Sequence, residues 1–258
     1  MPPATATSKY MGLTINLQSR KIVTILGCFA LGFLLSSTVS HILKYGFGQV
    51  PGLFRWFNID GEKNFPAAFS AALLLFCAAL LLLIAGFKHA IHSREAHHWA
   101  GLGMIFLLLA SDEWLSFHEK LGSAIQDWLP RNSVFHFAWI AAGAVFVIAV
   151  GLAYWKFLLR LPKRYCRLFL MAAGIFITGA IGMEIAAGFY AVNHQQWSRT
   201  VWLLLTTVEE GLEMAGVLTF IYTLLTYIQE FIGELRIRIA SSASPAQPIE
   251  LGATTRLE

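Results

Sequence analysis

The sequence predicts an all-α integral membrane protein, a bundle of six transmembrane helices with both termini in the cytoplasm. Three observations support this fold class. Hydrophobic residues make up 57% of the 258 residues and charged residues only 13%, whereas soluble proteins average about 25% charged. Six apolar segments reach the ~20 residues that a helix needs to cross a ~30 Å hydrocarbon core. Lys and Arg gather in alternate connections, which orients the bundle.

The six predicted spans lie near residues 22–43, 66–87, 99–121, 134–158, 166–191 and 200–228. The first follows Arg20 and Lys21 and is longer than the core of a signal peptide, so we expect a retained helix. The third is the least regular, because charged residues interrupt its second half. The predicted organisation is a polar N-terminal tail over 1–20, a transmembrane domain over 21–230 and a mostly disordered tail over 231–258.

The distribution of basic residues predicts the orientation and the compartment. With the N-terminus inside, most Lys and Arg residues fall on the inner side, and the loop 156–167 is the richest. Basic loops stay in the cytoplasm, so both termini are expected there. The short outer loops fit a bacterial inner membrane, which is the predicted localisation.

Composition also argues against several classes of function. The net charge of +4 follows from these loops, and no basic run with interleaved aromatic residues outside them indicates nucleic-acid binding. Cys28, Cys77 and Cys166 show no Cys-x-x-Cys spacing, which argues against a disulfide framework or a thiolate metal site. The expected partners are the lipid bilayer and a lipid-like substrate, with a homo-oligomer or a larger membrane complex as alternatives.

Acidic residues occur at membrane depth in three of the predicted spans. A charged side chain at the centre of a span costs about 2.5–3.5 kcal/mol, so such residues need partners and usually mark a functional site. The acidic residues are Asp112, Glu113 and Glu119 in the third span, Glu184 in the fifth, and Glu209, Glu210 and Glu213 in the sixth. His118, also in the third span, is a candidate member of the same site.

The expected depths bring these spans to one pocket. At about 1.5 Å of rise per helical residue, Asp112, Glu184 and Glu209 all fall in the outer half of the membrane. We therefore expect the three helices to present their acids to a pocket that opens outward. Glu62, in the first outer loop, is expected to cover this pocket from above.

Helical spacing sorts the residues of the third span. In a continuous helix, Asp112, Ser116 and Glu119 share one face. His118 lies off this face, and it joins the pocket only if the helix departs from ideal winding. A second interpretation places His118 and Glu119 at the outer aqueous interface.

Bunched carboxylates repel one another, so the set must share protons or hold a cation. Oxygen ligands with one or two histidines suit Fe, Mn or Zn, and we predict a divalent metal ion of this kind. The two predicted catalytic carboxylates are Glu113 and Glu210. A hydrogen-bonded polar core that serves only helix packing is the structural alternative. The predicted metal ligands are Glu62, Asp112, His118, Glu119, Glu184, Glu209 and Glu213.

Three groups of residues carry a family resemblance: Asp60-Gly-Glu62-Lys-Asn64, Ser111-Asp112-Glu113 with His118-Glu119, and Glu209-Glu210 with Glu213. With these groups the chain resembles uncharacterised bacterial six-span membrane proteins over roughly residues 50–230. That resemblance implies no activity. The chain is also partly similar to membrane-embedded hydrolases of the alkaline ceramidase type, which use Ser, Asp and His around zinc, but it lacks their three ligating histidines.

Three functions fit these features. The first is a metal-dependent membrane enzyme, a hydrolase or an oxidoreductase, whose apolar substrate enters from lipid. The second is a transporter or channel for protons or cations that uses the carboxylates as a relay. The third is a non-catalytic subunit of a membrane complex. A bound metal ion supports the first function, ion flux the second and a co-purifying partner the third.

Overall fold

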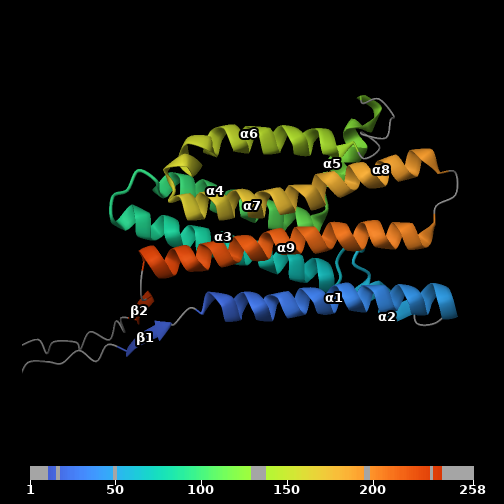
Figure 1. Cartoon of the computed structure of the whole chain (residues 1–258), viewed down its shortest axis with the longest axis horizontal. Helices are drawn as coiled ribbons and strands as arrows, with labels where there is room; N and C mark the ends of the chain where they lie inside the picture. Colours follow the sequence, from blue (N-terminus) through green and yellow to red (C-terminus); the bar gives the residue numbers. More distant parts are fainter. Residues whose placement is uncertain are drawn as a thin grey trace, which may run out of the picture. The chain divides into compact units, whose positions relative to one another are not determined.

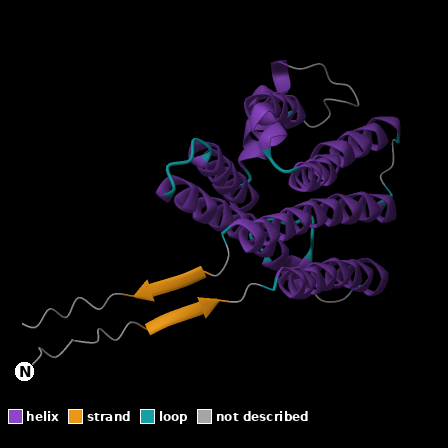
Figure 2. Ribbon diagram, turned by 60° about the vertical axis from the view of Figure 1, so that its left-hand side comes forward, coloured by secondary structure: helices purple, strands orange, loops and turns teal. Residues whose placement is uncertain are grey.

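A computed structural model describes residues 11–15, 18–48, 51–128, 138–194, 198–232 and 235–239. The chain divides into a helical unit, 17–233, and a small unit formed by the two chain ends. In the small unit, β1 (Met11–Ile15) pairs with the antiparallel strand β2 (Leu235–Ile239) (Figure 2). The sequence predicts a polar tail over 1–20 and a mostly disordered tail over 231–258, and the structure has one strand in each range. The alternation Leu-Arg-Ile-Arg-Ile of β2 has the period of two that favours a strand.

The helical unit consists of long helices connected by short loops (Figures 1 and 2). Its single helices are α1 (Ser19–Phe47), α2 (Pro51–Phe57), α3 (Phe65–Ala90), α6 (Trp139–Arg160) and α9 (Arg199–Phe231). Two further stretches are composite. The first joins α4 (Ala96–Leu115), α5 (Phe117–Ile125) and the 3-10 turn η1 (Gln126–Trp128), and the second joins α7 (Lys163–Ile177), the π-helix η2 (Thr178–Met183) and α8 (Glu184–Asn193).

Helix length and composition make the chain a multi-pass membrane protein. Among the described residues, α1, α3, α6, the run Lys163–Asn193 and α9 are each long and apolar enough to cross a membrane. The bent pair α4–α5 counts as a sixth crossing if it forms one span. The prediction of a bundle of apolar helices is confirmed to this extent. The first residues of the predicted span 134–158 lie outside the described residues, which resume at Ala138.

The helix α9 lies in the middle of the bundle and contacts α1, α3 and α7 (Figure 1). Its C-terminal half is buried, as expected for a helix surrounded by others. The apolar side chains buried there are Val217, Phe220, Ile221, Leu224, Leu225 and Ile228. Because three helices pack on α9, its carboxylates can face acids from several elements.

An aromatic core fills the end of the bundle that carries the α3–α4 and α6–α7 turns. The fully buried ring of Trp99 lies 4.8 Å from that of Tyr227 and 5.2 Å from that of Phe157. Phe169 meets Phe220 edge-on at 4.9 Å. Inside a membrane such packing relies on van der Waals contact between closely fitted side chains. This end of the bundle is therefore closed by apolar side chains.

Small residues bring the run α7–η2 very close to α9. A Cβ added at Gly216 would lie 2.7 Å from the backbone nitrogen of Phe176. One added at Gly179 would lie 2.9 Å from the carbonyl oxygen of Glu209 and 3.0 Å from the nitrogen of Glu213. Glycine is the residue that permits such an approach between membrane helices. At both positions the backbones of α9 and of the run α7–η2 are therefore in close contact.

The loop 58–64 is fixed to the helices around it. Its Asn64 side chain accepts a hydrogen bond from Ala67 N–H at 3.1 Å, which caps α3, and donates to the Asn58 carbonyl at 2.6 Å. The Ile59 N–H donates to the Ser37 hydroxyl of α1 at 2.9 Å. These bonds hold the loop in one conformation over the end of the bundle that carries α5.

Replacing Asn64 with Ala should lower the free energy of unfolding by about 1–2 kcal/mol, because α3 loses its cap and Asn58 loses its partner. The measurement is thermal unfolding of the purified protein in detergent. Asn193→Ala is the control, since among the described residues that exposed side chain bonds only to Phe189 within α8. Equal melting temperatures for the two variants would contradict a capping role for Asn64.

Candidate functional site

The predicted helix that carries four of the nine predicted site residues breaks at Ser116. On either side of this residue, α4 ends and α5 begins at an angle of 79°. Ser116 is buried and adopts a left-handed backbone conformation with φ 51°, which residues other than glycine rarely occupy. The prediction of one continuous helix over 99–121 is therefore wrong. The common face predicted for Asp112, Ser116 and Glu119 is lost with it.

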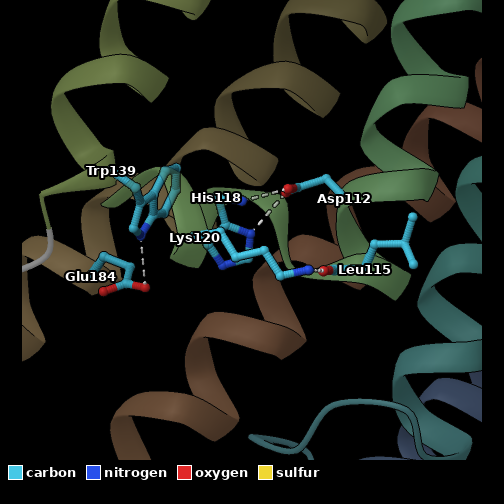
Figure 3. A network of polar contacts seen from close by, with 6 residues as sticks. All are labelled: Asp112, Leu115, His118, Lys120, Trp139 and Glu184. Carbon is cyan, nitrogen blue, oxygen red and sulfur yellow. Dashed lines mark hydrogen bonds and ion pairs between the residues drawn. The ribbon is translucent and has the colours of Figure 1, made fainter. Parts of the chain in front are cut away.

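Asp112 bridges this break from the last turn of α4. Its Oδ1 accepts a hydrogen bond from the His118 backbone N–H at 2.8 Å, and its Oδ2 lies 2.8 Å from His118 Nδ1 (Figure 3). Its backbone carbonyl accepts a bond from the Ser116 N–H at 2.6 Å. The one carboxylate thus caps the start of α5 and orients the histidine ring. His118 joins the acids because the helix breaks, a larger departure from ideal winding than we expected.

Lys120, which belongs to α5, contacts the last residue of α4 across the break. Its Nζ donates a hydrogen bond to the carbonyl of Leu115 at 2.7 Å (Figure 3). Carbonyl groups in the last turn of a helix have no partner within the helix, so this contact satisfies one of them. The break therefore has its own set of hydrogen bonds.

Substitutions at Ser116 should separate backbone strain from side-chain contacts. A β-branched residue is very unfavourable at positive φ, so Ser116→Val should lower the free energy of unfolding by about 2 kcal/mol or more. Ser116→Gly fits the conformation and should unfold within about 1 kcal/mol of wild type. Thermal unfolding in detergent measures both variants. If Val and Gly are equally stable, the left-handed conformation is not part of the folded protein.

Glu62 reaches the break from the loop 58–64. A hydrogen bond with Ser116 lowers the pKa of the exposed Glu62 carboxyl below its ordinary value. A further side-chain hydrogen bond links Glu62 to Glu119 of α5. The loop is also tied to α9, where Trp202 Nε1 donates to Asp60 Oδ2 at 3.1 Å. Two of the predicted ligands, Glu62 and Glu119, thus lie side by side next to the break.

Trp139, the first residue of α6, connects His118 to Glu184. Its Nε1 donates a hydrogen bond to Glu184 Oε1 at 3.3 Å, and its ring lies 5.1 Å from the His118 ring (Figure 3). This residue was not among the predicted site residues. A tryptophan at the end of an apolar segment is typical of the interfacial belt, and nothing in its sequence neighbourhood indicates the distant partner.

A second group of carboxylates lies between α4 and α9. Its members are half-buried and within electrostatic range of one another: Glu113 interacts with Glu210 and Glu213, and Glu209 interacts with Glu184. The π-helix η2 contacts α9 at Glu209 and Glu213 through the close approach at Gly179, and π-helices are frequent at functional sites. Of the predicted catalytic carboxylates, Glu113 and Glu210 both belong to this group.

No group of three Asp, Glu, His or Cys side chains is placed to hold one metal ion among the residues that the structure describes. Asp112 pairs with His118, whereas Glu184 bonds to Trp139 on the far side of the histidine ring. The predicted Fe, Zn or Mn ion therefore stays a prediction.

Apolar helices, with acids and one histidine gathered at a helix break, define a multi-pass membrane protein with a polar site near one end of its bundle. The chain belongs to the family of a domain of unknown function, DUF8692, whose model matches residues 22–228. This match covers most of the chain, as the predicted family resemblance did. No curated protein and no solved structure matches the chain.

Proposed function

We propose that this chain is a membrane-embedded enzyme in which His118, held by Asp112, is the general base for an apolar or lipid-like substrate. The 2.8 Å contact between Asp112 Oδ2 and His118 Nδ1 carries the proposal. A carboxylate at Nδ1 keeps the proton on that nitrogen and makes Nε2 the proton acceptor. In the part of the chain that the structure describes, no hydrogen bond uses Nε2, which leaves this nitrogen without a partner that would compete for a substrate proton.

The surroundings of His118 support this role. The side chains of His118 and Asp112 are 35% and 31% exposed, so the pair is open to a substrate. When Nε2 takes a proton from water or a substrate hydroxyl, the ring becomes positively charged. Asp112 and, across Trp139, Glu184 interact electrostatically with the ring and stabilise that charge.

Apolar side chains beside the break support a substrate with a hydrocarbon part. Four large side chains around it are 39–50% exposed: Trp114, Leu115, Phe117 and Leu121. Exposed apolar side chains of a membrane protein face lipid. These side chains would contact the hydrocarbon part of a lipid-like substrate, and this end of the bundle is the one predicted to face outward.

A relay for protons or cations is the second candidate function, favoured by the four carboxylates that interact between α4 and α9. A conducting path needs polar groups along the whole bundle. Beyond Glu213, however, α9 buries Val217, Phe220 and Ile221, and the hydroxyl of Thr223 bonds to its own helix at the Thr219 carbonyl. This interruption supports a site open at one end. Proton or cation flux into liposomes that contain the protein would favour the relay instead.

The proposed enzyme can be tested before its substrate is identified. The full chain is reconstituted into liposomes of a total bacterial lipid extract, and lipid species are followed over time by mass spectrometry. We expect at least one species to be consumed with wild-type protein and none in protein-free liposomes. If the lipid profile stays unchanged across several extracts, the lipid-enzyme proposal is wrong.

Metal dependence is tested on the same preparations by elemental mass spectrometry. If the carboxylates hold an ion, wild-type protein should carry Fe, Zn or Mn near unit stoichiometry or above, and Glu184→Gln/Glu209→Gln should lose it because both substitutions remove a ligand charge. His89→Ala is the control, since this exposed residue belongs to the last turn of α3, and the α3–α4 turn lies at the opposite end of the bundle from α5 (Figure 1). Absence of metal from active wild-type protein would end the metal prediction and leave the acid–base role of His118.

A further inference from the structure

Basic side chains gather where α6 turns into α7, at the opposite end of the bundle from the break. The two helices are joined only by Leu161 and Pro162, so the last turn of one adjoins the first turn of the other. On each helix two cations are spaced four residues apart and therefore share one face. These four exposed residues, here called the basic corner, are Lys156, Arg160, Lys163 and Arg167.

The described part of the chain supplies no counter-charge to the basic corner. Among the described residues, none of the four cations has an acidic partner, because the nearby acids pair elsewhere. Glu95 lies 3.0 Å from Lys88, and Glu230 lies 3.6 Å from Arg164 and accepts a hydrogen bond from Tyr165. Cations without an acidic partner at the end of α6 and the start of α7 attract an anion from outside the chain.

Apolar side chains continue from the basic corner along both helices. Leu152, Trp155 and Leu159 of α6 are 75%, 58% and 60% exposed, and Leu170 and Met171 of α7 are 55% and 49% exposed. In a membrane these side chains face hydrocarbon. The surface thus combines cations at the α6–α7 turn with exposed apolar side chains farther along both helices.

We propose that the basic corner binds the phosphate headgroup of an anionic phospholipid, whose acyl chains lie along the exposed flank of α6 and α7. Basic groups between membrane helices recognise such headgroups. A soluble anion would use the cations alone, whereas a phospholipid matches both parts of the surface. The site is separate from His118 and does not depend on the proposed enzyme activity.

The test uses the full chain in detergent, titrated with phosphatidylglycerol or with phosphatidylcholine, and counts bound lipids by native mass spectrometry. We expect wild type to prefer phosphatidylglycerol. Lys163→Gln/Arg167→Gln should weaken that binding about tenfold or more, since each cation near a membrane surface contributes several-fold. The matched control Lys21→Gln/Arg94→Gln removes one exposed cation from the start of α1 and one from the α3–α4 turn, and both elements lie at the same end of the bundle as the α6–α7 turn (Figure 1). It should change binding less than about twofold.

Three results would overturn the proposal. Equal weakening in the two double variants would mean that general positive charge, rather than the basic corner, attracts the lipid. Equal binding of phosphatidylcholine would remove the role of the anionic headgroup. Complete competition by inorganic phosphate at the concentration of the lipid would assign the corner to a soluble anion. Thermal unfolding of all variants should match wild type, because only exposed side chains change.

Discussion

Replacing His118 with Ala should lower lipid turnover by roughly 10²–10⁴-fold, the usual contribution of a general base. The fold should survive, because the histidine side chain is 35% exposed and its loss leaves no closed cavity. Turnover is measured in liposomes by lipid mass spectrometry, and folding by thermal unfolding in detergent. His89→Ala is the control and should retain wild-type turnover.

The variant Asp112→Asn distinguishes the two roles of Asp112, which are to orient the His118 ring and to cap the start of α5. The Asn oxygen still accepts the hydrogen bond from the His118 N–H, so α5 keeps its cap, but the charge that stabilises the protonated ring is gone. We expect a large loss of turnover with a small change in melting temperature. The double variant Asp112→Asn/His118→Ala should be no worse than His118→Ala alone, because residues that act as a unit are not additive.

Two outcomes would contradict the proposed pair. Turnover retained in His118→Ala would remove the histidine from the chemistry. Turnover lost in Asp112→Asn only in proportion to a loss of folded protein would make the contact between the two residues a structural cap. In that case the hydrogen-bonded polar core, which is the structural alternative, would describe this part of the molecule.

The membrane architecture could be predicted because lipid imposes strong constraints on a sequence. Apolar segments of spanning length are unambiguous, and the described helices α1, α3 and α9 extend only a few residues beyond the predicted spans. Depth along the helices also predicted that Asp112 and Glu184 would lie near one another. In the structure, both flank His118, Asp112 directly and Glu184 through Trp139.

The break at Ser116 was not predicted, because neither glycine nor proline marks it. The spacing of apolar residues does not indicate where a helix is interrupted at a single residue. A local signal was nevertheless present: Ser116 followed three residues later by Glu119 has the pattern that starts many helices. In the structure Asp112, six residues upstream of the amide that it binds, does the capping instead. This hydrogen bond can form only where the chain bends, and it then stabilises the bend.

The pairing of Glu184 with Trp139 could not be predicted for a different reason. The two residues are 45 positions apart in the chain, and only the packing of α6 against α5 and η2 brings them together. There, a Cβ added at Gly122 would lie 3.2 Å from the Trp139 nitrogen. Small residues in a sequence can indicate that helices approach closely, but they do not indicate which side chains such an approach brings together.

Replacing Gly216 with Ala should lower the free energy of unfolding by about 1–3 kcal/mol, the usual cost of overpacking. The added methyl group would meet the backbone nitrogen of Phe176 at 2.7 Å and its Cα at 2.9 Å. Backbone atoms cannot rotate away, so α7 must move from α9. For a chain of this size we expect a melting temperature lower by about 2–4 °C per kcal/mol.

Gly174→Ala is the matched control for this prediction. Gly174 lies on α7, and a Cβ there has nothing within 4 Å, so Ala should be neutral or slightly stabilising through its better helix propensity. Equal melting temperatures for Gly216→Ala and Gly174→Ala would show that the close contact of α7 with α9 is absent from the folded protein. The same interface holds Gly179 against Glu209 and Glu213. Gly179→Ala should therefore also displace the carboxylates of α9, whereas Gly182→Ala, which meets only ordinary contact with Thr178, should leave them in place.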